Sequence, residues 1–146
     1  MECTLDRPQV LGLIQACDVY VSLHRSEGFG RTLAEAMLFG KPVVATDYSG
    51  NRDFLTVKTG FPVNYQETPV NKNDYPFVEN GEAVWANPDI EHAAYQMNRA
   101  LDAVCDDDFT NLVRVYAMRQ FSSERIGHLM HNYLTSVFSQ VTAYPA

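Results

Sequence analysis

Residues 19–46 carry the pattern that most constrains the fold of this chain. A short run of β-branched and aromatic residues, 19–23, is followed by a loop with two glycines and by a helical segment, 31–39, that is almost wholly apolar from residue 33 onward. A Gly-x-Pro sequence separates this helix from a second apolar run, 43–46. A strand, a helix and a strand in this order, with both strands nearly continuously apolar, predict an α/β fold whose parallel sheet is covered on both faces.

The loop and the helix contain two carboxylates in a setting that indicates a ligand site. Gly28 and Gly30 flank Phe29, so the backbone can turn sharply and approach a ligand without a Cβ in the way. The following helix begins with free N–H groups, which favour a phosphate. Glu27 lies in the loop, and Glu35 is the one polar side chain in the apolar part of the helix. Because a buried carboxylate needs a partner, we expect a site for an anionic, hydroxyl-rich ligand.

Simpler roles remain open for the polar side chains of this region. Glu27 could cap the helix, which is compatible with ligand binding, and Glu35 could face solvent, although its apolar neighbours favour burial. Arg25 could pair with a phosphate or with a neighbouring carboxylate, and the sequence does not distinguish the two. His24 fits a structural loop histidine better than a proton relay.

The rest of the chain predicts a third strand over 60–65 and helices after residue 88. Residues 66–88 are rich in Pro, Asn, Gly and aromatic residues and indicate a β-hairpin-like excursion at the sheet edge. Two C-terminal helices show apolar faces, and we expect the face of the last helix to point inward. These faces consist of Ile90, Ala94, Met97, Leu101 and Val104 in the first helix, and of Ile126, Met130, Tyr133, Leu134, Val137 and Phe138 in the last.

Composition and charge narrow the range of partners. The net charge of −7, with most of the acidic excess beyond Asn73, argues against nucleic acid. Cys3, Cys17 and Cys105 are widely spaced and fit small buried thiols, and no His or Cys spacing indicates a metal. The sequence shows no apolar run long enough for a membrane span and no signal sequence, so we expect a cytoplasmic protein.

The spacing of Glu27 and Glu35 resembles the E-x7-E motif of retaining glycosyltransferases with the GT-B fold, of the family 4 type. The resemblance extends through residues 16–22 (ACDVYVS), 40–47 (GKPVVATD) and 59–63 (TGFPV). It implies a Rossmann-like parallel sheet that forms the second half of a GT-B C-terminal, donor-binding domain. The chain would then be one partial domain with a nucleotide-sugar-binding βαβ core, an excursion and C-terminal helices, over residues 1–65, 66–88 and 89–146.

The resemblance also implies a reaction and roles for the site residues. The complete enzyme would transfer a hexose from a nucleoside diphosphate sugar to a hydroxyl acceptor with retention, with no cofactor and no essential metal. Glu27 would be the catalytic-site carboxylate close to the donor sugar, and Glu35 would bind the ribose hydroxyls. The other donor-binding residues would be Gly28, Phe29, Gly30, Arg31, Thr32 and Leu33.

The resemblance covers only the later strands of the donor domain, so it implies a missing N-terminal acceptor domain or a partner chain. Whether the isolated chain is an active enzyme stays open. The alternative is a non-catalytic binding or self-association module derived from a glycosyltransferase. Strand 19–23 would lack its usual neighbour, and its open edge predicts a homo-oligomer.

Overall fold

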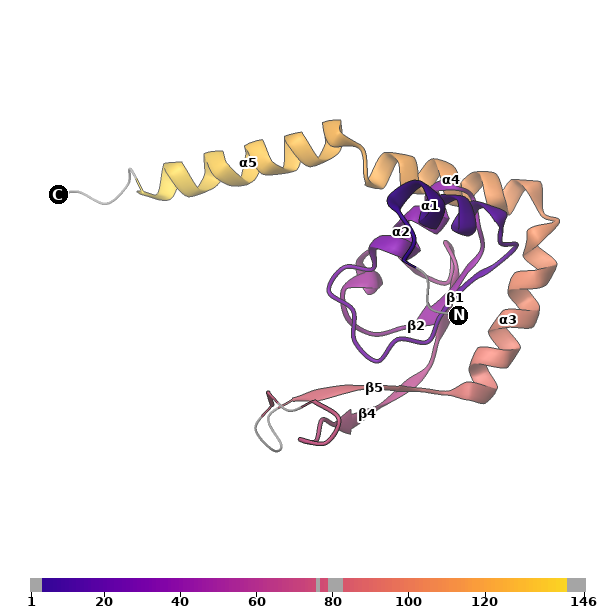
Figure 1. Ribbon diagram of the computed structural model, residues 1–146. Helices are drawn as coiled ribbons and strands as arrows, with labels where there is room; N and C mark the ends of the chain where they lie inside the picture. Colours follow the sequence, from indigo (N-terminus) through magenta and orange to yellow (C-terminus); the bar gives the residue numbers. More distant parts are fainter. Residues whose placement is uncertain (1–3, 76, 79–82, 142–146) are drawn as a thin grey trace.

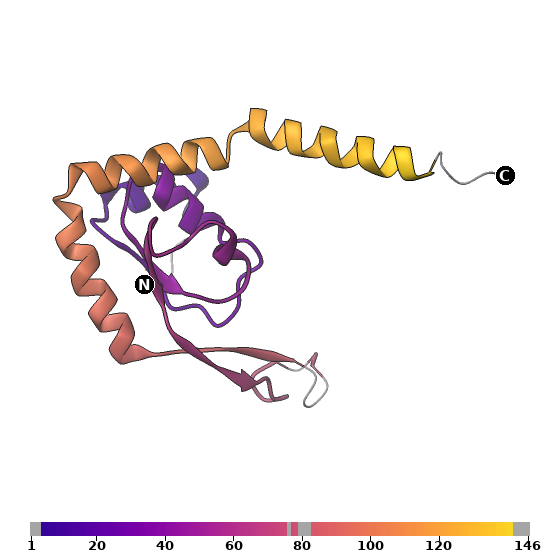
Figure 2. The same ribbon diagram turned by 180° about the vertical axis from the view of Figure 1, so that it is seen from behind.

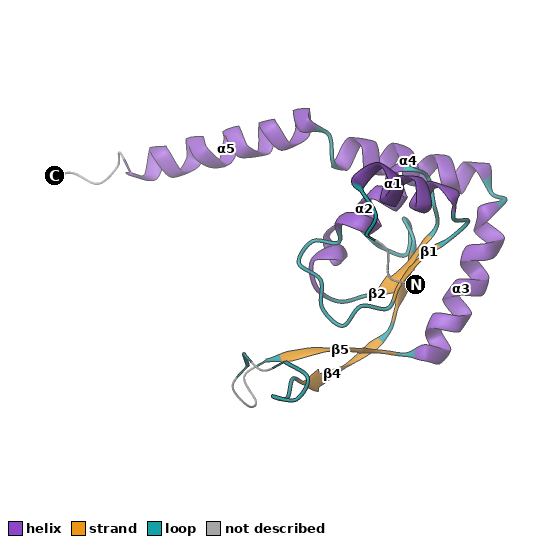
Figure 3. Ribbon diagram, in the orientation of Figure 1, coloured by secondary structure: helices purple, strands orange, loops and turns teal. Residues whose placement is uncertain are grey.

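The computed structural model describes residues 4–75, 77, 78 and 83–141 (Figure 1). A three-stranded sheet lies between helices, and a separate pair of strands follows it (Figure 3). In chain order the elements are α1 (Arg7–Ala16), β1 (Tyr20–Ser22), α2 (Arg31–Leu38), β2 (Val43–Thr46), the 3-10 helix η1 (Ser49–Asp53), β3 (Phe61–Val63), β4 (Tyr65–Pro69), β5 (Val84–Pro88), α3 (Ile90–Val104), α4 (Asp107–Gln120) and α5 (Ser123–Val141).

The three-stranded sheet is parallel throughout, in the order β1-β2-β3. Its register places Tyr20 beside Val43 and Val44 beside Phe61. All four residues of the central strand β2 are buried, as expected for a strand with a neighbour on each side and helices on each face. The predicted α/β, Rossmann-like parallel sheet is confirmed.

Alternate residues of β2 enter two separate cores. Val43 and Ala45 pack with α1, α2 and α4, and Leu33 and Met37 of α2 are completely buried there. Val44 faces the other way and packs with β3 and α3. The site helix α2 is therefore held between the sheet and two further helices (Figure 3).

The start of α1 follows its sequence signal closely. Asp6 Oδ1 accepts a hydrogen bond from the Gln9 amide at 2.9 Å, and Gln9 Oε1 accepts one from the Asp6 amide at 2.9 Å. This reciprocal pair is the capping box that the sequence Asp-Arg-Pro-Gln predicts. It fixes Arg7 at the first position of the helix, where its side chain can reach α2.

The excursion after β3 is an antiparallel hairpin. β4 and β5 pair from Tyr65 opposite Pro88 to Pro69 opposite Val84. The expected hairpin is confirmed, but β4 and β5 form a sheet of their own and do not extend the edge of the parallel sheet. Residues 76 and 79–82 of the excursion lie outside the described residues.

The apolar face that the sequence shows on α3 is not the face that is buried. Ala93, Gln96 and Ala100 are buried, whereas Ile90, Met97 and Leu101 are exposed. Small alanine side chains let α3 lie close against the short sheet, and the Gln96 amide donates to the Pro62 carbonyl at 2.6 Å. Periodicity identified an apolar stripe on this helix but did not identify the stripe that meets β3.

The apolar stripe of α5 is exposed as well, contrary to the prediction. Its residues from Ile126 to Phe138 are exposed in the described structure. Both views show α5 extending away from the rest of the chain (Figure 1, Figure 2). Among the described helices, none combines the length and the hydropathy that a membrane span requires.

Candidate functional site

The loop between β1 and α2 is anchored to the loop after β2. The ring of His24 lies with Nε2 3.1 Å from the Tyr48 carbonyl oxygen and 3.1 Å from Asn51 Oδ1. Asn51 is fully buried, and its amide nitrogen donates to the Thr46 carbonyl at 2.9 Å. These contacts support the structural role expected for His24.

Close backbone contact fixes the segment that carries Glu27. The Glu27 carbonyl accepts hydrogen bonds from the Gly50 amide at 3.2 Å and from Ser49 Oγ at 2.6 Å. A Cβ added at Gly50 would lie 2.0 Å from the Gly28 carbonyl oxygen, so this close approach requires glycine. The bend around Gly28 is therefore held by η1 and not only by its own glycines.

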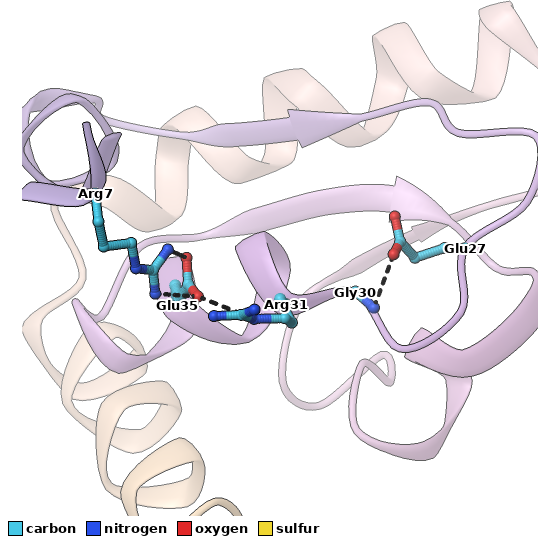
Figure 4. A network of polar contacts seen from close by, with 5 residues as sticks. All are labelled: Arg7, Glu27, Gly30, Arg31 and Glu35. Carbon is cyan, nitrogen blue, oxygen red and sulfur yellow. Dashed lines mark hydrogen bonds and ion pairs between the residues drawn. The ribbon is translucent and has the colours of Figure 1, made fainter. Parts of the chain in front are cut away.

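The N-terminus of α2 has no side-chain cap. Gly30 is the N-cap residue, with φ of 87° in the left-handed region, and its own amide donates to Glu27 Oε1 at 3.1 Å (Figure 4). Among the described residues, the amides of Arg31, Thr32 and Leu33 have no hydrogen-bond acceptor. The first turn of α2 therefore combines the positive end of the helix dipole with three backbone donors that have no acceptor in the described structure.

Glu35 is sheltered and paired. Its carboxylate accepts two hydrogen bonds from the Arg7 guanidinium, at 2.5 Å to Oε1 and 2.9 Å to Oε2 (Figure 4). Arg31 Nε lies 3.9 Å from Oε1. Only 12% of the Glu35 side chain is exposed, so the solvent-facing alternative does not hold. The hydrogen bonds to Glu35, with its charge, raise the pKa of Arg7.

The two carboxylates do not meet. Glu27 lies in the loop that precedes Gly30, whereas Glu35 points toward Arg7 on α1 (Figure 4).

Phe29 is 46% exposed and contacts two further rings, Phe54 at 5.3 Å and Phe121 at 5.8 Å between centroids. Phe29, Arg31 and Glu35 line one open pocket of about 300 Å³, and Glu27 lies outside its lining. The lining is completed by Ala34, Leu38, Phe121 and Ile126.

Two arginines have partners that sequence reasoning missed. Arg7 pairs with a residue 28 positions away, and only the packing of α1 on α2 brings the two together. Arg25 pairs with no carboxylate among the described residues and instead lies over the Trp85 ring, 3.6 Å from its centroid. No local signal links Arg25 to a hairpin sixty positions later.

A metal site is not evident in the described part of the chain. No group of three or more His, Cys, Asp or Glu side chains gathers there in an arrangement that could hold a metal ion. Asp47, which follows β2, is engaged by Arg52 at 3.5 Å.

Comparison with known proteins shows similarity to glycosyltransferases. Residues 3–64 match the family described as "Glycosyl transferases group 1". The chain is also similar to "Putative glycosyltransferase 48" of Sulfolobus islandicus filamentous virus (isolate Iceland/Hveragerdi), with 25% identity over 107 residues. This match covers 73% of the chain but only 33% of the viral protein. The chain therefore spans about a third of the length of that relative.

Proposed function

Because residues 3–64 match the family described as "Glycosyl transferases group 1", we propose that this chain forms the donor-binding part of a glycosyltransferase. In the complete enzyme, a sugar passes from a nucleoside diphosphate sugar to a hydroxyl acceptor with retention at the anomeric carbon. The observation that carries this proposal is the uncapped N-terminus of α2, which stands between Glu27 and Glu35.

The diphosphate is assigned to the first turn of α2. The amides of Arg31, Thr32 and Leu33 are unused donors, and an anion at a helix N-terminus gains about 0.3–2 kcal/mol from the dipole. The anomeric C–O bond to the diphosphate breaks while the acceptor oxygen bonds to the same face of the anomeric carbon, and the proton of the acceptor hydroxyl passes to the leaving diphosphate. Negative charge develops on the leaving diphosphate, where these fixed donors stabilise it.

The ribose is assigned to Glu35. An ionised carboxylate has about four acceptor positions on its two oxygens, and Arg7 uses one on each. The remaining positions suit two vicinal hydroxyls. Arg7 also holds the carboxylate in a single orientation, so little side-chain freedom is lost when a ribose binds.

The donor sugar is assigned to Glu27 and the bend at Gly28. Glu27 Oε1 accepts from the Gly30 amide, which orients the carboxylate and leaves Oε2 for a sugar hydroxyl. Nothing lies within 4 Å of the position where a Cβ at Gly28 would stand, so a ring can approach this backbone closely.

Isothermal titration calorimetry tests the proposal. UDP-glucose, ADP-glucose and GDP-mannose are titrated into the wild-type chain, Glu35→Gln and the control Glu67→Gln, whose side chain is exposed on β4. We expect at least one donor to bind, and Glu35→Gln to weaken it roughly tenfold, or about 1.4 kcal/mol, because a charged acceptor is lost. The proposal would be contradicted if none of the donors bound, or if Glu35→Gln bound them as tightly as the wild type and Glu67→Gln do.

A second candidate function is a non-catalytic module that self-associates. Among the described residues, β1 pairs with β2 alone, so its other edge is available to a further strand. This alternative predicts a dimer that covers the edge of Tyr20–Ser22 and a flat calorimetric response to every donor. Light scattering coupled to size-exclusion chromatography at micromolar concentration tests it, and a monomer counts against it.

A further inference from the structure

A second pocket, distinct from the α2 turn, lies between the β1–α2 loop and the β4–β5 hairpin. Its volume is about 470 Å³, within the range of about 300–1,000 Å³ typical of small-molecule sites. A backbone hydrogen bond of 2.8 Å, from the Ala86 amide to the Arg25 carbonyl, joins the loop to the hairpin. The lining consists of Arg25, Ser26, Val70, Tyr75, Val78, Ala83, Val84 and Trp85.

Arg25 gives this pocket a positive charge that no carboxylate of the described residues balances. Among the described lining residues Arg25 is the charged one, and no described carboxylate lies within ion-pair distance of it. Its Nε donates to the Ala86 carbonyl at 3.4 Å, and its guanidinium carbon lies 3.6 Å from the centroid of the Trp85 ring. The two terminal nitrogens have no partner in the described structure, and such a fork recognises a carboxylate or a phosphate through two parallel hydrogen bonds.

The rest of the lining suits a ring with apolar faces and hydroxyl groups. Tyr75 is 51% exposed and presents an aromatic surface beside Val84 and the buried Val70. The Ser26 hydroxyl makes no hydrogen bond within the described residues and is therefore available to a ligand. Aromatic and aliphatic surface accepts the C–H face of a sugar ring, while hydroxyl and guanidinium groups fix its orientation.

We propose that this pocket binds a sugar that carries an acidic group, with the carboxylate or phosphate on Arg25 and the ring against Tyr75. Ser26 directly precedes Glu27, so a ligand here lies next to the place assigned to the donor sugar. The bound sugar would be the acceptor, and this last assignment rests on the proposed function. Binding of the acidic sugar itself does not require a donor.

The single tryptophan of the chain, Trp85, reports directly on this pocket. Its fluorescence is followed during titration with methyl glucuronide, glucose 6-phosphate, methyl glucoside and inorganic phosphate. We expect the two acidic sugars to bind more tightly than the neutral glycoside and than phosphate alone. A preference for only one of them identifies the acid as a carboxylate or as a phosphate.

Variants separate charge recognition from general damage to the fold. Arg25→Gln should weaken the acidic sugars roughly tenfold and leave the neutral glycoside within about twofold. Arg25→Lys keeps the charge but loses the planar fork, and it should give an intermediate affinity. Arg114→Gln, on the exposed surface of α4, is the matched control, and circular dichroism verifies the fold of each variant.

Equal affinities for all four ligands, or unchanged binding by Arg25→Gln, would overturn the proposal. Because no nucleotide is present in this titration, a failure of the acidic sugars to bind does not change the result expected for donor binding in the calorimetry. A Glu35→Gln variant should bind the acidic sugars like the wild type even where its donor affinity is lost. The two proposals therefore fail independently.

Discussion

Replacing Gly50 with alanine should displace the loop that carries Glu27. The added Cβ would stand 2.0 Å from the Gly28 carbonyl oxygen, 2.8 Å from its carbon and 3.0 Å from Phe29 Cα. All three are backbone atoms, so the loop must move by more than about 1 Å to reach ordinary van der Waals separation. Overpacking of this kind costs about 1–3 kcal/mol, and each hydrogen bond lost to the Glu27 carbonyl adds about 1 kcal/mol.

Gly28→Ala is the matched control for Gly50→Ala. No atom lies within 4 Å of a Cβ at Gly28, so this change should leave the free energy of unfolding within about 0.5 kcal/mol of wild type. Urea denaturation followed by far-ultraviolet circular dichroism measures both variants. We expect Gly50→Ala to be less stable by about 2–4 kcal/mol. If the two variants unfold at the same urea concentration, the close packing of the two loops is not as described.

Three further predictions concern the fold and the proposed donor site. Asn51→Ala should lower the free energy of unfolding by about 1 kcal/mol, because the Thr46 carbonyl keeps the Tyr48 amide but loses its second donor, and the His24 ring loses the Asn51 Oδ1 contact; an unchanged urea midpoint would contradict this. Gly12→Ala should raise the stability by about 0.5–1 kcal/mol, since the added methyl group meets no atom within 4 Å and alanine favours the helix; a lower melting temperature would oppose it. Arg7→Gln should weaken donor binding in calorimetry roughly fivefold, because Glu35 loses the partner that orients it, and tighter binding would show that Arg7 competes with the ribose instead.

The parallel core was largely predictable because its signals are local. The run 43–46 has apolar residues on both faces, and the structure makes it the buried central strand with the predicted bounds. The run 19–23 gives the shorter strand Tyr20–Ser22, and the third strand spans Phe61–Val63 within the predicted 60–65. Continuous apolar strands around a glycine-rich turn leave few alternatives to a βαβ arrangement.

The positions of α3 and α5 in the chain were predicted, but their apolar stripes do not face the core. Both α3 and α5 have apolar stripes, and periodicity alone directs such stripes inward. In the structure α3 presents Ala93 and Ala100 to the sheet, because small side chains allow close approach over strands of only three or four residues. The buried face of a helix depends on the surface it meets, and that surface is not encoded in its own periodicity.

At the candidate site, the sequence indicated the residues but not their contacts. The partial burial of Glu35 followed from its apolar neighbours, and the bend at Gly28 followed from the two glycines. The bidentate contact of Glu35 with Arg7 and the stacking of Arg25 on Trp85 arise from tertiary packing between distant segments. Roles that depend on such pairs are therefore open to prediction only once the fold is known.

The central claim is that the first turn of α2 and the bend before it bind a nucleoside diphosphate. Amide chemical shifts of the ¹⁵N-labelled chain, recorded while UDP, ADP or GDP is added, test it directly. We predict that at least one of these nucleotides shifts the amides of Gly30, Arg31 and Thr32 most strongly. If those three amides stay unmoved with every nucleotide, or if the shifts gather on the hairpin or on α5 instead, the claim is contradicted.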